Sequence, residues 1–219
     1  MSNKLRIRFS KTGRAKYISH LDLMATMRRG LLRAGVNLKY SEGFNPHPYM
    51  SAALPLSVGL GSVCELLDFG AAAGYIPPDD LAVRLTAALP EGIEVFEVYA
   101  SHRKFADIKW TGINGSLTFD APRPNAARKL TQRFAATSII ISKKTKSGTS
   151  EVDIVPLIDR VDFEGEGEVI LKARVHAQNP SLTPHNLLSA LSGEYAELTP
   201  DFAMFTRTEV YDANMNVFR

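Results

Sequence analysis

The sequence predicts an α+β protein made of two successive β-α-β-β-α-β units, a tandem ferredoxin-like fold with antiparallel sheets and helices on one face. Three observations predict it: short apolar segments that alternate with period two, amphipathic segments of helical length between them, and the same order of both in each half of the 219 residues. The expected boundary near residues 101–112 gives an N-terminal half over residues 1–104 and a C-terminal half over residues 112–219.

The first expected strand covers residues 5–10, where apolar residues alternate with basic or polar ones. Its apolar positions are Leu5, Ile7 and Phe9, and its basic positions are Arg6 and Arg8. Successive side chains of a strand point to opposite faces. One face of this strand is therefore expected to be buried and the other to be wet and basic.

A helix is expected next, ending at Gly35, which favours a left-handed cap. Ser19 and Asp22 form a capping pattern, in which the hydroxyl accepts a bond from a free amide and the carboxylate complements the helix dipole. Apolar residues at helical spacing mark one side of this helix, whereas Arg29 and Arg33 lie on the opposite side.

The remaining elements follow from turn and periodicity signals. Residues 40–48 (Tyr-Ser-Glu-Gly-Phe-Asn-Pro-His-Pro) predict a turn-rich loop. Strands near 50–54 and 64–69, a helix from Pro77 to about Leu89 and a strand over 93–98 complete the first half. The second half is expected to contain a strand at 117–119, a helix at 125–135, a long antiparallel stretch over 139–141, 152–155 and 169–175, a helix that Thr183 caps, and a closing strand at 202–211.

Basic residues are concentrated at the start of the chain. Ten of the 26 lysines and arginines fall within the first 39 positions, and Asp22 and Glu42 are the only acids in the first 60. Residues 1–60 therefore carry about +8, while the rest carries about −5 and the whole chain +3. Folding does not require such an asymmetry of charge, so it predicts a polyanionic partner.

Composition also excludes several kinds of site. The single Cys64 excludes an internal disulfide, a four-cysteine zinc site and a cysteine-ligated iron–sulfur cluster. No nucleotide-binding glycine motif is present, so no cofactor is expected. With no apolar run of about 18 residues and no signal-peptide pattern, a cytoplasmic protein without membrane contact is expected.

The basic residues are expected to share one RNA-binding surface with nearby aromatic and polar side chains. Cations hold phosphates and aromatic rings stack on unpaired bases. The expected phosphate-binding residues are Arg6, Arg8, Lys11, Arg14, Lys16, Arg29 and Arg33, and the expected stacking residues are Tyr17, Tyr40 and Phe44. A pocket beside them is expected to include Ser19, Asp22, Ser41 and Asn45.

Two histidines offer an enzymatic alternative. His20 and His47 are candidate general acids or bases, because imidazole titrates near neutral pH, and prolines on both sides of His47 restrict its backbone. Packing or hydrogen bonding is an equally simple role for either residue. Whether the two meet is not decided by their spacing. His20, Asp22 and His47 lack the spacing typical of metal ligands, so no metal is expected.

Motifs in the first 60 residues carry a resemblance to a known family. They are residues 9–13 (Phe-Ser-Lys-Thr-Gly), 17–23 (Tyr-Ile-Ser-His-Leu-Asp-Leu), 40–48 and 51–59 (Ser-Ala-Ala-Leu-Pro-Leu-Ser-Val-Gly). On these motifs the chain closely resembles the bacterial radical SAM-linked (radical SAM-associated) proteins, a family of unknown function. The chain departs from the family at Ala25, where an arginine is usual, and this weakens the expected anion-binding site.

The resemblance implies a partner. Members of the family occur beside, or fused behind, a cobalamin-binding radical SAM protein. A radical SAM cluster needs three thiolates and this chain has one cysteine, so the resemblance implies that the chain is the partner and not the radical enzyme. At the level of fold alone, the tandem layout and residues 55–59 also look like the CRISPR RNA-processing endoribonucleases.

Three functions therefore remain open. The leading expectation is an RNA-binding accessory protein that presents RNA, or a ribosome-related substrate, to a separate radical SAM protein. The alternatives are a metal-independent endoribonuclease that uses His20 or His47, and a protein-interaction module whose basic face docks on an acidic partner.

Overall fold

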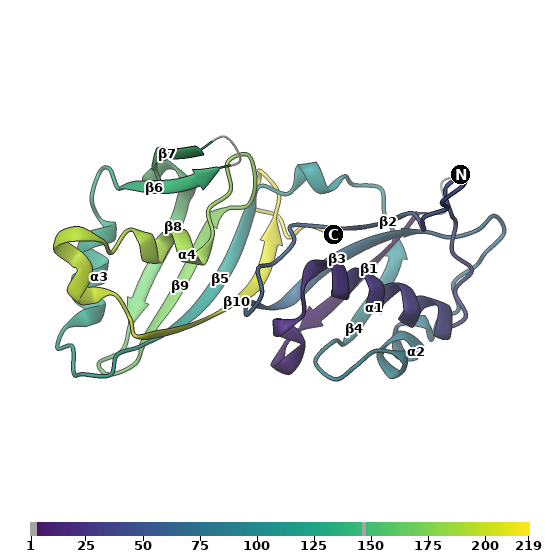
Figure 1. The fold of residues 1–219 in the computed structure, drawn as a ribbon, viewed down its shortest axis with the longest axis horizontal. Helices are drawn as coiled ribbons and strands as arrows, with labels where there is room; N and C mark the ends of the chain where they lie inside the picture. The colour runs from purple at the N-terminus through teal and green to yellow at the C-terminus, as the bar shows by residue number, and fades with distance from the viewer. Residues whose placement is uncertain (1–3, 146–147) are drawn as a thin grey trace. The chain divides into compact units, whose positions relative to one another are not determined.

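Antiparallel strands dominate the computed structural model, which describes residues 4–145 and 148–219 (Figure 1). The described chain divides into unit 1, which runs up to Phe105 and includes Arg219, and unit 2, Ala106–Phe218. Within each unit, every strand pairing among the described residues is antiparallel. The predicted mixed α+β class with antiparallel sheets is therefore confirmed.

Unit 1 contains four strands and two α-helices in the order β-α-β-β-α-β. In sequence they are β1 (Lys4–Lys11), α1 (His20–Arg33), β2 (Met50–Ala52), β3 (Gly61–Gly70), α2 (Leu81–Ala88) and β4 (Val95–Ala100). A 3-10 helix, η1 (Gly13–Tyr17), joins β1 to α1. The strands lie side by side in the order β4-β1-β3-β2.

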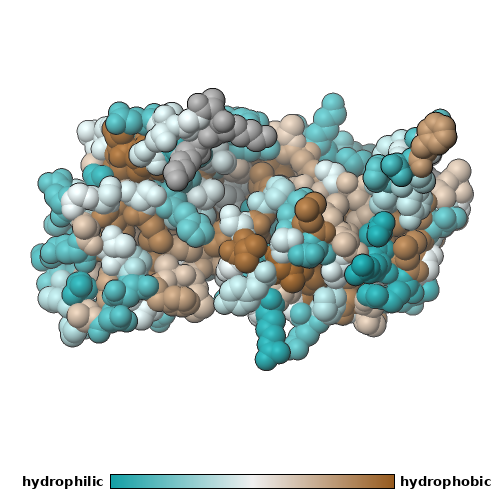
Figure 2. Space-filling model, in the orientation of Figure 1, coloured by the Kyte–Doolittle hydropathy of each residue, from teal (hydrophilic) through white to brown (hydrophobic). Residues whose placement is uncertain are grey.

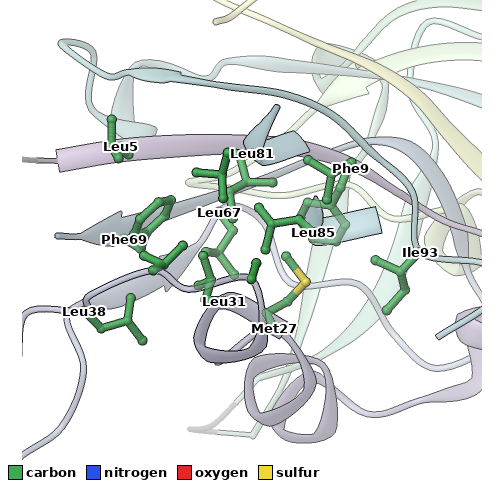
Figure 3. Packing of buried hydrophobic residues seen from close by; sticks show 14 of the residues in the cluster. Leu5, Phe9, Met27, Leu31, Leu38, Leu67, Phe69, Leu81, Leu85 and Ile93 are labelled. Carbon is green, nitrogen blue, oxygen red and sulfur yellow. The ribbon is translucent and has the colours of Figure 1, made fainter. Parts of the chain in front are cut away.

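One face of the unit 1 sheet is apolar and carries both helices. Ile7 of β1 pairs with Leu67 of β3 and Val98 of β4. These positions belong to the core that α1 and α2 cover, and Figure 3 shows Met27 of α1 and Leu85 of α2 within it. Burial of apolar surface at about 25 cal/mol per Å² makes this layer the main source of unit 1 stability.

Unit 2 combines a second four-stranded sheet region with a separate hairpin. Its elements are β5 (Trp110–Thr118), α3 (Ala126–Phe134), β6 (Ile140–Thr145), β7 (Gly148–Asp153), β8 (Ile158–Glu164), β9 (Val169–His176), α4 (Pro184–Ser189) and β10 (Phe202–Tyr211). Four strands follow the order β10-β5-β9-β8, whereas β6 pairs with β7. Short 3-10 helices, η2 (Phe105–Asp107), η3 (Val155–Leu157) and η4 (Gly193–Leu198), connect elements.

The predicted antiparallel stretch is confirmed in its first part, because residues 139–141 pair with 152–155 as β6 and β7 (Ile140 with Asp153, Ile141 with Val152). Its extension to residues 169–175 is wrong. β9 pairs with β5 and β8, not with β7. A turn separates β7 from β8, because Pro156 lies in η3 and Asp153 accepts hydrogen bonds from the amides of Ile139 and Val155 at 3.0 and 3.1 Å. These bonds join the two ends of the β6–β7 hairpin and end its second strand at Asp153.

Candidate nucleic-acid interface

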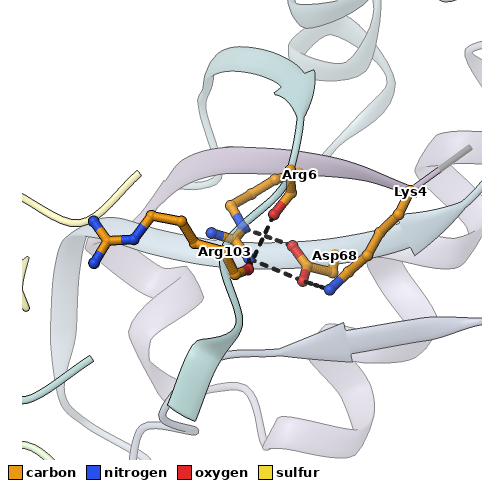
Figure 4. A network of polar contacts seen from close by, with 5 residues as sticks. Lys4, Arg6, Asp68 and Arg103 are labelled. Carbon is orange, nitrogen blue, oxygen red and sulfur yellow. Dashed lines mark hydrogen bonds and ion pairs between the residues drawn. The ribbon is translucent and has the colours of Figure 1, made fainter. Parts of the chain in front are cut away.

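The central cation of β1 is buried. Arg6 has no exposed surface, and its Nε and Nη2 donate to the two carboxylate oxygens of Asp68 on β3 at 2.6 and 3.0 Å. Its Nη2 also donates to the carbonyl of Arg103 at 2.8 Å (Figure 4). The Phe105 ring centroid lies 4.4 Å from Arg6 Cζ. The expectation that Arg6 faces solvent is wrong, because residues 101–105, the covering segment, lie over it.

Two further cations of β1 are also engaged within unit 1. The Arg8 side chain is 22% exposed and lies 4.0 Å from the Glu97 carboxylate and 5.3 Å from the Phe96 ring centroid. Lys11 is 2% exposed, and its ammonium donates to the carbonyl of Lys16 at 3.1 Å. Lys11 therefore adds nothing to an exposed basic surface, and Arg8 adds little.

Two cations and an exposed ring lie between β1 and α1. Arg14 and Tyr17 of η1 are exposed, and Lys16 Nζ lies 5.1 Å from the Tyr17 ring centroid. The predicted cap follows: Ser19 Oγ accepts a bond from the Asp22 amide at 3.1 Å and donates to its carboxylate at 2.7 Å. Because each side chain binds the other, Ser19 and Asp22 have a structural role at this helix start.

The cations of α1 lie over the opposite face of the sheet from Arg6. Arg29 and Arg33 are exposed, and Arg33 Nη2 donates to the carbonyl of Ala88, the last residue of α2, at 2.5 Å. The view in Figure 2 shows hydrophilic side chains interspersed with hydrophobic ones. The early cations are thus distributed over both layers of unit 1 and do not form one continuous surface.

The loop over residues 40–48 is closed on itself. Tyr40 and Pro48 form an isolated bridge, the Ser41 amide donates to the His47 carbonyl at 2.8 Å, and the His47 amide donates to Ser41 Oγ at 2.9 Å. Phe44 at the tip is fully exposed. Ser41 therefore shapes the loop, while the aromatic tip is presented to solvent along with Asn45 and His47.

A pocket of about 830 Å³ lies where this loop meets the sheet. Two lysines, Lys4 and Lys39, and the buried Asp68 contribute its charges, and Tyr40 and Tyr49 contribute its rings. The rest of its lining is Leu38, Pro48, Met50, Ser51, Phe69, Gly70 and Ala71 to Ala73. Such a combination of apolar lining, rings and a few charged groups is typical of small-ligand sites.

The charge of the pocket is positive. Lys4 Nζ lies 2.6 Å from Asp68 Oδ2, so Lys4 and Arg6 share a single carboxylate. Lys39 Nζ lies 5.3 Å from the Tyr49 ring centroid and forms no ion pair within the described part of the chain. An anionic group entering the pocket would therefore meet an ammonium that no acid already neutralises.

The two candidate histidines lie at opposite ends of the unit 1 sheet. His20 starts α1 and follows the end of β1 through η1. The loop of His47 is tied to Gly70, the last residue of β3, and Gly70 pairs with Lys4 at the start of β1. The eight residues of β1 span about 23 Å, so the two imidazoles form no common site.

Neither a metal centre nor a membrane span emerges from the described residues. No group of three or more histidine, cysteine, aspartate or glutamate side chains in residues 4–145 and 148–219 is arranged to hold a metal ion. Within the same ranges, no helix combines the length and the apolar character that crossing a membrane requires.

Sequence reasoning did not identify Asp68 as part of a site. It lies in the strand Cys64-Glu-Leu-Leu-Asp-Phe69, where it is a charged residue in a largely apolar run. A buried carboxylate needs a charged partner. The arginines that alternate with apolar residues in β1 could therefore have indicated that Asp68 pairs with one of them. Lys4, Lys39 and Tyr49 also gain a place in the candidate site from the pocket that they line.

Comparisons with known proteins identify a family without an assigned activity. A family model described as an uncharacterized protein conserved in bacteria (DUF2344) matches residues 4–184. No curated protein matches the chain. A crystal structure of an unknown protein from Galdieria sulphuraria is 12% identical, with coverage of 94% of this chain and 99% of that chain and a TM-score of 0.28. A TM-score this low carries no argument about fold or function.

Proposed function

The chain belongs to the DUF2344 family of uncharacterized bacterial proteins, and on that premise we propose that it is an RNA-binding accessory protein. The observation that carries the proposal is the closed loop of residues 40–48, which presents a fully exposed Phe44 beside a positively charged, tyrosine-lined pocket. Aromatic rings beside cations are the usual means of binding single-stranded nucleic acid.

The residues assigned to RNA are those that are exposed or, in the case of Lys16, half-buried. We assign phosphate contacts to Arg14, Lys16, Arg29, Arg33 and Lys39, and stacking contacts to Tyr17, Tyr40 and Phe44. Arg6 and Lys11 are left out because they are buried, and Arg8 because Glu97 and Phe96 engage it. The two ends of β1 lie about 23 Å apart, a distance that roughly four to seven extended nucleotides span at about 3.4–6 Å each.

The partner in this proposal is a separate cobalamin-dependent radical SAM protein, with RNA or ribosome-related modification as the joint activity. The motifs in the first 60 residues support it through their resemblance to radical SAM-linked proteins. With one cysteine, the chain lacks the three thiolates of a radical SAM cluster. The strand orders β4-β1-β3-β2 and β10-β5-β9-β8 support the further proposal that both units are ferredoxin-like.

The dependence of RNA affinity on salt tests the binding proposal. Each phosphate neutralised on a single strand contributes about −0.7 to the slope of log K against log salt. The triple variant Arg14→Ala, Lys16→Ala, Lys39→Ala is expected to reduce the magnitude of the slope by about 2. Three exposed cations of unit 2, changed together as Lys109→Ala, Arg128→Ala and Arg160→Ala, serve as the charge-matched control. A flat slope for the unaltered protein overturns the proposal.

Co-purification tests the accessory role. A tagged chain is expected to retain a radical SAM protein from its host extract, before and after nuclease treatment. Retention that nuclease abolishes would indicate a bridge of RNA rather than a direct partner. Retention that nuclease leaves intact, together with a flat salt slope, would favour the protein-interaction module instead. The separation of His20 from His47 supports RNA binding over an endoribonuclease that would need both imidazoles at one site.

A further inference from the structure

We propose that the pocket lined by Lys4, Lys39, Tyr40, Tyr49 and Asp68 binds one unpaired nucleotide of the RNA, with its base against a tyrosine and its phosphate at Lys39. This inference rests on the proposed function and makes it more specific, because it limits the substrate to RNA with a single-stranded loop or end.

Backbone hydrogen bonds hold the rim of the pocket in place. The Lys39 amide donates to the Gly70 carbonyl at 2.9 Å, the Gly70 amide donates to the Tyr49 carbonyl at 2.7 Å, and the Tyr49 amide donates to the Lys39 carbonyl at 3.0 Å. A Cβ at Gly70 would lie 3.2 Å from Tyr49 Cβ and 3.4 Å from Lys39 Cβ. The ring and the amine are therefore mounted on a preorganised segment, which lowers the entropic cost of binding.

The charges select an anion. Asp68 is buried, and its oxygens already accept bonds from Arg6 and Lys4. This carboxylate is thus committed to two cations and leaves a positive excess at the wall. Lys39 contacts the Tyr49 ring through its ammonium, a weak interaction at an exposed site, which a phosphate oxygen can replace with a charge-assisted hydrogen bond.

The rings and the volume select a nucleotide among anions. Tyr40 is 39% exposed and Tyr49 is 51% exposed, so each offers part of its ring to a ligand. A volume of about 830 Å³ exceeds what phosphate alone occupies and lies within the range of small-ligand pockets. A base paired in a duplex cannot stack on a protein ring, because its faces are covered by neighbouring bases. The occupant is therefore an unpaired nucleotide.

The test uses the full chain and an eight-nucleotide RNA that carries one 2-aminopurine, whose fluorescence falls on stacking. Tyr49→Ala is expected to weaken binding by roughly 5- to 100-fold, the range for losing one stacked base, and to abolish the fluorescence change. Tyr195→Leu is the matched control, since Tyr195 also lies under a cation, with Arg133 Cζ 4.5 Å from its ring centroid, but in unit 2. A duplex of the same sequence is expected to bind at least tenfold more weakly.

A second variant fills the pocket without removing a polar contact. Ala73→Trp places an indole at the pocket lining, and Ala87→Trp places one on an exposed position of α2 as the control. Ala73→Trp is expected to remove the fluorescence change while Ala87→Trp preserves it. Circular dichroism and thermal unfolding establish that both variants fold.

The outcomes separate the two proposals. RNA binding that neither Tyr49→Ala nor Ala73→Trp alters overturns the pocket assignment and leaves the RNA-binding function standing. If no RNA binds, the proposed function fails, and titration with adenosine 5′-monophosphate then decides the pocket: binding that Lys39→Ala weakens supports it, and no binding overturns it. An oligoglutamate of equal charge that binds as tightly as the RNA also overturns it, because the rings would then contribute nothing.

Discussion

Arg6 and Asp68 are paired residues in the β1–β3 register, and their side chains form two hydrogen bonds inside unit 1. Both groups are almost completely buried, since Arg6 is 0% and Asp68 3% exposed. Arg6 of the basic strand β1 thus forms an internal ion pair with the carboxylate that β3 supplies. The role of Arg6 is therefore to stabilise the sheet, and not to bind RNA as the sequence predicted.

Loss of Asp68 is expected to destabilise unit 1 strongly. Asp68→Asn leaves the buried guanidinium without a compensating charge, at a cost of about 3–5 kcal/mol in the free energy of unfolding. Lys4→Ala removes a partly exposed cation from the same carboxylate and is expected to cost less than about 1 kcal/mol. Urea unfolding of both variants checks the difference. Equal losses of unfolding free energy in the two variants would show that the buried Arg6–Asp68 pair contributes no more to stability than the partly exposed Lys4–Asp68 pair.

Gly92 is expected to tolerate alanine poorly. Its φ is +88°, and a Cβ would lie 2.5 Å from the Thr12 carbonyl oxygen. Strain of about 1–2 kcal/mol in a left-handed backbone and a further 1–3 kcal/mol of overpacking predict a loss of about 2–4 kcal/mol for Gly92→Ala. Gly13→Ala is the control, because φ is +51° there but no atom lies within 4 Å. Its loss is expected to stay near 1–2 kcal/mol in chemical denaturation.

Asp153 is expected to make the stability of the β6–β7 hairpin depend on pH. The amides of Ile139 and Val155 hold the pKa of Asp153 below its ordinary value. Its contribution is therefore present above the unfolded pKa of about 3.9 and is lost as pH falls through the lower folded pKa. Asp153→Asn is expected to lower the denaturation midpoint at pH 7 and to have little effect near pH 2. Asp79→Asn, at an exposed position, is the control. The same deficit at both pH values would contradict the prediction.

Removal of both histidines is expected to leave any RNA cleavage unchanged. His20 and His47 lie at opposite ends of the sheet, so neither can assist the other in proton transfer. Purified protein and the His20→Ala, His47→Ala double variant, each incubated with bacterial RNA and excess chelator, provide the measurement. Cleavage that appears with the unaltered protein and disappears in the variant would restore the endoribonuclease alternative.

The starts of α1 and α4 were predictable because their signals are local, whereas α2 begins at Leu81 and not at the predicted Pro77. Ser19 and Thr183 both cap helices through their own hydroxyls, at 3.1 and 3.3 Å from the amide three residues on. β8 was missed because its sequence, Ile-Asp-Arg-Val-Asp-Phe-Glu, resembles a charged surface segment. Pairing of β8 with β9 depends on contacts between residues distant in sequence, which periodicity does not report.

The candidate site was predictable in composition but not in arrangement. The loop of residues 40–48 could be recognised from its turn residues, and the exposure of Tyr17 and Phe44 agrees with the expected surface. Burial of Arg6 depends on residues 101–105, nearly one hundred positions later in the chain. The separation of the two histidines likewise depends on the path of the loop after α1, and no local pattern encodes that path.

The covering of Arg6 also determines where the first unit can be cut. A fragment ending at Ala100 would lack the Arg103 carbonyl that accepts a bond from the guanidinium and the Phe105 ring that lies against it. Water would then reach a charge that the intact fold keeps dry. Expression of the first unit by itself therefore has to extend through Phe105, five residues past the end of its last strand.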